Sequence, residues 1–79
     1  MNNTEKYDNA FIESFSITAE DLGDSLKYES ISDWDSIGHM GLIAELEDSF
    51  DISMEMDDII DFSSYEKGII IMRKYEIDI

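Results

Sequence analysis

The sequence contains no cysteine and no proline. Without cysteine the chain can form neither a disulfide framework nor a thiolate metal site, and nothing in it indicates an oxidising compartment. A chain of 79 residues buries only a modest share of its surface, so the packing of its elements must supply its stability. We therefore expect one domain over residues 1–79, with a single core.

Basic residues and long apolar runs are scarce as well. Five Lys and Arg stand against twenty Asp and Glu, which gives a formal net charge of −15. Such a charge repels nucleic-acid phosphates and anionic membrane surfaces, so we expect neither as a partner and expect proteins with basic patches instead. No apolar run approaches the length that spans a bilayer, and no secretory signal opens the chain. These absences predict a cytoplasmic protein, by default a monomer.

The apolar content indicates a folded chain despite this charge. Apolar residues make up 43% of the sequence, including one Trp, four Tyr and four Phe, which is too many for a disordered polymer. A first amphipathic helix is predicted from Thr4, its expected cap, because apolar residues recur there at intervals of three and four. These core positions are Tyr7, Ala10, Phe11 and Phe15.

A long loop is predicted over residues 17–32, where turn formers and acids show no sustained period. Loops of this length in small domains are usually held by their own side chains. We expect Leu22, Leu26 and Ile31 to pin it to the core, with one short helical turn over residues 18–22.

The second predicted helix, residues 36–50, carries two different faces. Its core stripe consists of His39, Leu42, Ile43, Leu46 and Phe50. The opposite face mixes small and apolar residues with carboxylates, where a solvated face would be uniformly polar. It comprises Ile37, Gly41, Ala44 and Asp48, flanked by Met40, Glu45 and Glu47. This mixture is typical of a surface that docks transiently.

Asp35 and Ser36 stand where the cap of this helix belongs, because a short oxygen-bearing side chain can accept a hydrogen bond from an amide of the first turn. Ser36 can equally be an exposed hydroxyl at the helix start, where the helix dipole would favour an attached phosphate. Gly38 and Gly41 each cost about 1 kcal/mol relative to Ala within a helix. Their presence predicts a close approach by a partner or by a neighbouring element.

Two further helices complete the all-α prediction. A short third helix is expected within residues 54–62, and a fourth begins at a cap supplied by Ser63 or Ser64. Arg73 and Lys74 would favourably occupy the last turn of the fourth helix. The residues expected to face the core are Met56, Ile59, Ile60 and Phe62 in the third helix and Tyr65, Ile69, Ile70 and Met72 in the fourth.

The run Asp35-Ser36-Ile37, followed by Leu42, Leu46, Phe50 and Ile52, resembles the signature of the acyl carrier proteins. The resemblance covers nearly the whole chain and is strongest from residue 31 to 62. It implies a four-helix bundle with a long loop between the first two helices and a short third helix. It also implies that a separate phosphopantetheinyl transferase attaches a 4′-phosphopantetheine arm from coenzyme A to Ser36, with Asp35 helping to position the serine.

By this resemblance the chain is a free-standing acyl carrier protein and not an enzyme, and it holds acyl groups as thioesters for fatty-acid, polyketide or other acyl-transfer biosynthesis. Its partners would be acyl-transfer and chain-modifying enzymes with basic docking patches. The residues expected to contact them are Ile37, Met40, Gly41, Ala44, Glu45, Glu47, Asp48, Asp57 and Asp58.

Several other interpretations compete with this one. A peptidyl carrier domain would share the fold and the modified serine, and an acidic mimic of nucleic acid would explain the charge without Ser36. Asp33, Asp35 and Gly38 fit positions 1, 3 and 6 of a calcium-binding loop, but position 12 would be Ala44 where a bidentate Glu is required. Ser36 and His39 lie one helical turn apart, yet no oxyanion loop surrounds them, so we do not interpret them as a nucleophile and base.

Overall fold

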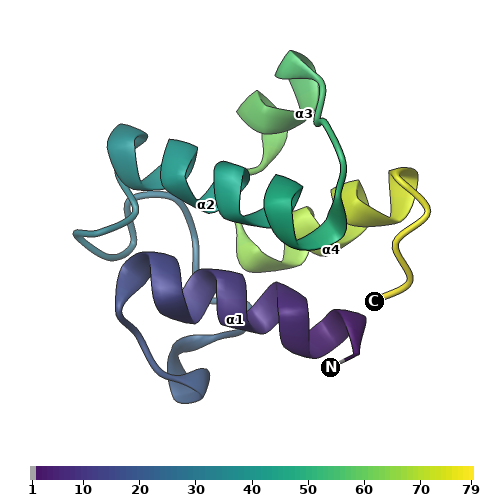
Figure 1. Cartoon of the computed structure of the whole chain (residues 1–79). Helices are drawn as coiled ribbons and strands as arrows, with labels where there is room; N and C mark the ends of the chain where they lie inside the picture. Colours follow the sequence, from purple (N-terminus) through teal and green to yellow (C-terminus); the bar gives the residue numbers. More distant parts are fainter. Residues whose placement is uncertain (1) are drawn as a thin grey trace.

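The structure is a computed structural model that describes residues 2–79, and within this range it is all-helical apart from one isolated bridge. The four α-helices are α1 (Asn3–Phe15), α2 (Ser36–Phe50), α3 (Met56–Asp61) and α4 (Tyr65–Lys74), and a 3₁₀ helix, η1, spans Ala19–Asp21. The chain is thus a small helical bundle (Figure 1). None of these helices is long and apolar enough to cross a membrane. Met1, the first residue of the predicted domain, lies outside the described residues.

Helix α1 supplies much of the core. Its four predicted core residues are all buried. The helix begins one residue before Thr4, and the side-chain oxygen of Asn2 accepts a hydrogen bond from the amide of Glu5 at 2.8 Å. The expectation that Thr4 is the cap was therefore wrong, since an Asn amide oxygen caps at least as well. The helix ends at Ser16, which adopts the left-handed conformation with φ 54°.

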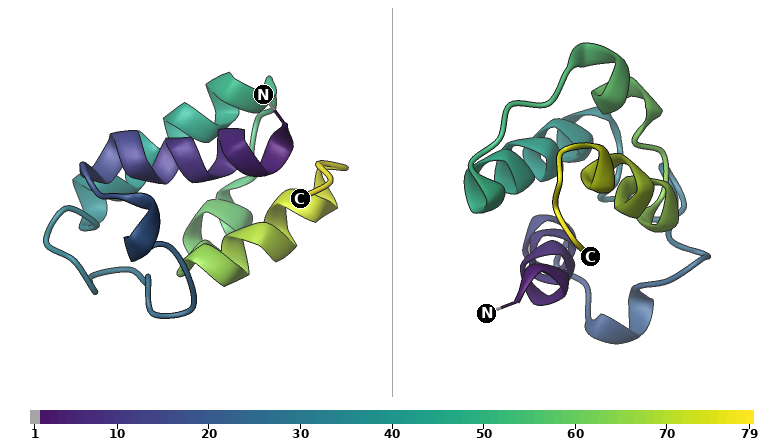
Figure 2. Two further views of the ribbon diagram at one scale, coloured as in Figure 1. Left: turned by 90° about the horizontal axis from the view of Figure 1, so that it is seen from below. Right: turned by 90° about the vertical axis from the view of Figure 1, so that its right-hand side faces the viewer.

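An aromatic cluster fills the space between the helices. Phe11 lies at its centre, with ring centroids 5.0 Å from Tyr7, 5.6 Å from Trp34 and 6.1 Å from Phe62. Trp34 comes from the segment that leads into α2, and its ring stacks on Phe15 with centroids 5.2 Å apart. Helix α1 lies along α2, with α3 on the far side of α2 (Figures 1 and 2). Helix α3 is therefore separated by α2 from α1, which contributes more aromatic residues to the cluster than any other helix.

The long connection between α1 and α2 is packed, as predicted. Leu26 is buried, Leu22 and Ile31 are half-buried against the core, and η1 provides the short helical turn. Two backbone hydrogen bonds, both of 2.9 Å, tie it to the start of α4: the amide of Tyr28 donates to Ser63, and the amide of Tyr65 donates to Leu26. The connection thereby brings Tyr28 next to the α3–α4 junction.

Helix α4 confirms one prediction and corrects another. Ser64 is the cap, accepting a hydrogen bond from the amide of Lys67 at 2.9 Å. Ile70, expected in the core, is exposed, and Ile71 is buried in its place. Residues 69–72 are all apolar, so the sequence there has no period to show which one faces outward. Gly68 is buried, and a Cβ at this position would collide with the Tyr7 hydroxyl and the Phe62 ring.

Candidate functional site

Ser36 is the first residue of α2 and its side chain is exposed. The cap of the helix is Asp35, whose side-chain oxygen Oδ1 accepts a hydrogen bond from the amide of Gly38 at 2.8 Å. Of the two candidates, Asp35 therefore satisfies the helix start. The hydroxyl of Ser36 is thus not needed for capping.

The two glycines of the first turns of α2 differ in their surroundings. A Cβ on Gly38 would collide with the carbonyl oxygen of Asp33, so this position needs glycine for the sharp entry into the helix. A Cβ on Gly41 would meet no neighbouring atom within 4 Å, and this glycine lies on the exposed side of α2. Of the two glycines predicted to allow a close approach, only Gly38 lies against another part of this chain.

The acids that fit part of a calcium-loop pattern have other uses here. Asp35 caps α2, and the backbone of Asp33 packs against Gly38. Within the part of the chain that the structure describes, no three or more His, Asp or Glu side chains converge in a way that could hold a metal ion.

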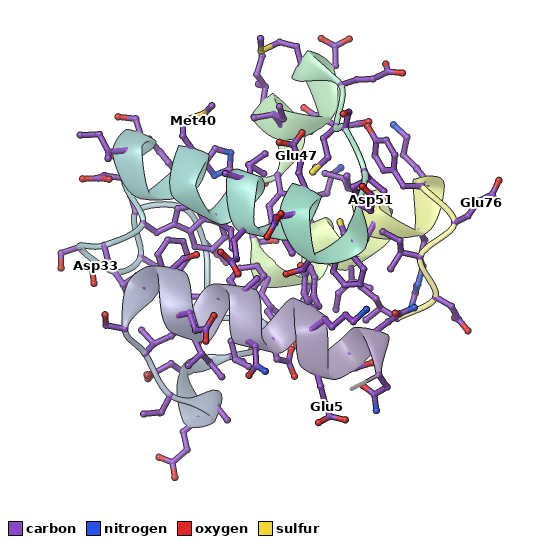
Figure 3. All side chains as sticks on the ribbon, in the orientation of Figure 1. Glu5, Asp33, Met40, Glu47, Asp51 and Glu76 are labelled. Atoms are coloured by element: carbon purple, nitrogen blue, oxygen red, sulfur yellow. The ribbon has the colours of Figure 1, made fainter. Side chains whose placement is uncertain are left out.

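A groove of about 340 Å³ opens beside Ser36, between α2 and α3. Most of its lining is apolar, and several of the lining side chains are large apolar groups that remain exposed. Met40 projects from the edge of α2 on the side where α3 lies (Figure 3). The lining residues are Tyr28, Ser36, His39, Met40, Met56, Ile59, Ile60, Phe62 and Ser63.

Two apolar side chains of α3, Met56 and Ile60, line this groove and remain exposed to solvent. Met56 and Ile60 are 70% and 69% exposed, so the expectation that they face inward was wrong. Phe62 is buried and Ile59 is half-buried, as predicted. A helix of six residues makes fewer than two turns, so its apolar residues do not repeat often enough to show which side faces the core.

The predicted docking residues of α2 fall into two groups. Met40 lines the groove together with Ser36. Ile37, Gly41, Ala44 and Asp48 follow one another along a separate exposed stripe of the helix. Ile37 is 83% exposed and is the residue of this stripe nearest to Ser36 in the chain. Ser36 therefore lies at the groove and directly precedes the exposed Ile37 in the chain.

The predicted carboxylates do not share one environment. Asp48 and Asp57 are exposed, and Glu45 is half-buried. Glu47 is also half-buried, and its Oε2 accepts a hydrogen bond from the amide of Met54 at 2.9 Å. Glu47 thus holds the segment that leads into α3 (Figure 3).

Asp58 is the clear correction among the predicted partner contacts, because it is only 5% exposed. Its carboxylate accepts hydrogen bonds from the Lys74 ammonium at 2.6 Å and from the Tyr75 hydroxyl at 2.5 Å. The hydrogen bond from Lys74, followed by that from Tyr75, holds the pKa of Asp58 below its ordinary value. Asp58 therefore fastens α3 to α4 and is not free to steer a partner.

His39 has both ring nitrogens engaged. Trp34 Nε1 donates to His39 Nδ1 at 2.9 Å, and His39 Nε2 lies 2.8 Å from the carbonyl oxygen of Ile59. Neither nitrogen is left to accept a proton from the Ser36 hydroxyl. Ser36 and His39 both line the groove, but they do not form a nucleophile–base pair.

Sequence reasoning missed part of the groove. Tyr28 was not singled out, Ser63 was considered only as a helix cap, and Met56 and Ile60 were assigned to the core. Met56 and Ile60 are four residues apart and so lie on one side of the helix, but their spacing does not show whether that side faces the core or the solvent. The sequence gives no signal for Tyr28, because its position depends on backbone hydrogen bonds to a distant junction.

Comparisons with family models, with curated proteins and with solved structures each found no match to this chain.

Proposed function

We propose that this protein is an acyl carrier: it holds acyl groups as thioesters on a 4′-phosphopantetheine arm attached to the hydroxyl of Ser36. The observation that carries the proposal is the pairing of an exposed serine at the start of α2 with an apolar groove directly beside it. The resemblance of Asp35-Ser36-Ile37 to the acyl-carrier signature supports the same assignment.

The residues around Ser36 fit such an arm. Because Asp35 caps the helix, the serine oxygen remains accessible to a modifying enzyme. A phosphodiester there would lie at the electron-poor end of a helix of fifteen residues. When bound, the arm supplies the thiol that the sequence lacks. The groove lining offers apolar side chains to whatever the arm carries.

The surface around the serine suits recognition by basic proteins. Ile37 and Met40 offer exposed apolar contacts within one turn of Ser36 on α2. Exposed carboxylates lie on the same elements, with Asp33 and Asp35 in the lead-in to α2, Asp48 in α2 and Asp57 in α3. Such charges raise encounter rates with basic partners and do so less at high salt. We propose a phosphopantetheinyl transferase and acyl-transfer enzymes as these partners.

The test is the intact mass of the protein after incubation with coenzyme A and a broad-specificity phosphopantetheinyl transferase. We expect the native chain to gain one phosphopantetheine and the Ser36→Ala variant to gain none. Ser63→Ala is the matched control, because this second serine also lines the groove and should leave the modification intact.

An unchanged native mass, with a known carrier modified in the same reaction, would contradict the proposal. The charge of −15 would then favour the acidic nucleic-acid mimic, which needs no modified serine. Competition with a DNA duplex for a basic DNA-binding protein would separate the two functions.

A further inference from the structure

Helix α3 has little of its own to keep it in place. It has six residues, its N-cap Glu55 makes no side-chain capping bond, and its two most exposed apolar side chains, Met56 and Ile60, point outward. A helix this short does not persist without tertiary contacts. Contacts with the neighbouring helices must therefore hold α3 in place and so keep Met56 and Ile60 at the groove.

Polar contacts hold α3 on two sides. On the side of α4, Asp58 pairs with Lys74 and Tyr75, and the Tyr75 hydroxyl accepts from the amide of Glu55 at 2.9 Å. On the side of α2, the contact between His39 Nε2 and the carbonyl oxygen of Ile59 ties the two helices together. The groove opens on this second side.

The Ile59 carbonyl is one of the carbonyls at the end of a helix that lack a full intrahelical partner. Its backbone partner, the amide of Phe62, lies at 3.4 Å, which is long for such a bond. The imidazole of His39 supplies the second and shorter hydrogen bond. A side chain of α2 thus hydrogen-bonds to one carbonyl group at the C-terminal end of α3.

Trp34 determines which nitrogen of His39 can serve. An indole N–H can only donate and a carbonyl oxygen can only accept. His39 must therefore accept at Nδ1 and donate from Nε2, which assigns the neutral tautomer with its hydrogen on Nε2. Trp34 is fully buried and stacked on Phe15, so the donor that fixes this tautomer is itself rigidly held.

We propose that His39 is a positioning residue: oriented by Trp34, it latches the end of α3 to α2 and so keeps Met56 and Ile60 at the groove beside Ser36. Its effect on the modification of Ser36 rests on the proposed function. The latch itself does not, and it can be measured on the unmodified protein.

The first measurement is the ¹⁵N spectrum of the wild-type imidazole. We expect the signature of the tautomer protonated on Nε2, with Nδ1 accepting a hydrogen bond. Trp34→Phe keeps an aromatic ring in the core but removes that donor, so it should shift the Nδ1 signal toward that of an imidazole nitrogen with no donor. A hydrogen on Nδ1 in the wild-type protein would overturn the proposal, whatever the variants do.

The second measurement is native-state hydrogen exchange in His39→Leu, which keeps side-chain bulk but removes both hydrogen bonds. Losing a bond of this kind should speed exchange at the amides of Ile59 and Phe62 by about tenfold relative to Phe11 in α1. His39→Gln carries one acceptor and one donor and should restore most of the protection. If His39→Leu left the ratio of exchange rates between α3 and α1 unchanged, the proposal that His39 latches α3 would be contradicted.

Ile71→Val is the control for general destabilisation, because Ile71 is buried in α4 and belongs to neither tie of α3. It should not change the exchange ratio between α3 and α1. If it raised this ratio as much as His39→Leu does, the latch would have no specific role.

The third measurement is steady-state phosphopantetheine transfer. We expect His39→Leu to raise KM severalfold with little change in kcat, because the docking surface is loosened while Ser36 keeps its place beside the cap. His39→Gln should return KM toward the wild-type value. A fall in kcat with an unchanged KM would contradict positioning through α3. Failure of the wild-type protein to be modified would remove the carrier function but leave the tautomer and exchange results to decide the latch.

Discussion

Helices α1 and α3 both carry apolar side chains, but most of those in α1 are buried whereas two of those in α3 are exposed. α1 buries all of its predicted core residues in an aromatic cluster. α3 exposes Met56 and Ile60 and is held through Asp58 and through the Ile59 carbonyl. Apolar packing thus holds α1 in place, whereas hydrogen bonds and an ion pair join the half-buried Ile59 side chain in holding α3. Segments held in the second way belong to the low-stability part of a protein, where binding surfaces are commonly found.

The largest effect should come from breaking the aromatic cluster. Phe11 is fully buried and contacts five other aromatic rings. Phe11→Ala should cost about 3–5 kcal/mol of unfolding free energy, which approaches the total stability of many small domains. Urea denaturation followed by circular dichroism measures it, and a loss below about 1 kcal/mol would contradict a stability centred on α1.

Gly68→Ala tests the close contact between α4 and this cluster. The added methyl group would collide with Tyr7 and Phe62, and such overpacking typically costs about 1–3 kcal/mol. Gly41→Ala is the matched control, because open space surrounds that position and the better helix propensity should add up to about 1 kcal/mol. The melting temperature should fall in Gly68→Ala and rise in Gly41→Ala. Two changes of the same sign would contradict the difference in packing between the two glycines.

Asp58→Asn tests the polar side of the comparison through pH. The pKa of Asp58 is lowered in the folded protein, so its ionised form stabilises the fold above the ordinary carboxyl pKa of about 3.9. This contribution is lost as pH falls through the lower folded value. Wild type should therefore be more stable than Asp58→Asn at pH 7, and the gap should close in acid.

Lys74 is 61% exposed, so solvent screens the pair and the loss should be smaller than that for Gly68→Ala. Urea titrations of both proteins from pH 7 to pH 3 provide the measurement. A gap that stays constant over this range would show that the charge of Asp58 has no part in the stability.

The smallest effect on stability is expected at the groove. Ile60→Ser removes an apolar side chain that is 69% exposed, and surface changes of this kind usually stay within about 0.5 kcal/mol. Under the proposed function it should nevertheless slow phosphopantetheine transfer to Ser36, by weakening the docking surface. A large loss of stability would mean that Ile60 packs inward, as its sequence position first suggested.

The same difference between α1 and α3 explains what could be predicted from the sequence. Tyr7, Ala10, Phe11 and Phe15 recur over successive turns of a long helix, so their period alone defined a buried face, and all four are buried. The stripe of α2 was equally readable, since Leu42, Ile43 and Leu46 are buried as expected.

The prediction of buried and exposed residues failed in α3, which is too short to show a repeating apolar pattern. Six residues of α3 cannot distinguish an inner from an outer side, so Asp58 was placed outside and Met56 inside. The roles of Trp34 and His39 were also hidden, because they depend on a carbonyl twenty residues further along the chain. The position of Ser36 at the start of α2 was predicted, whereas the groove beside it was not.

The two ends of the described chain lie next to each other: the side-chain amide of Asn3 donates to the backbone oxygen of Asp78 at 3.2 Å. Figure 1 shows both ends on one side of the molecule and the start of α2 on the other. An affinity tag or fluorescent reporter fused at either end would project away from the serine. A circular permutant that joins these ends through a short linker should keep the bundle intact and leave the whole surface of α2 and α3 unobstructed.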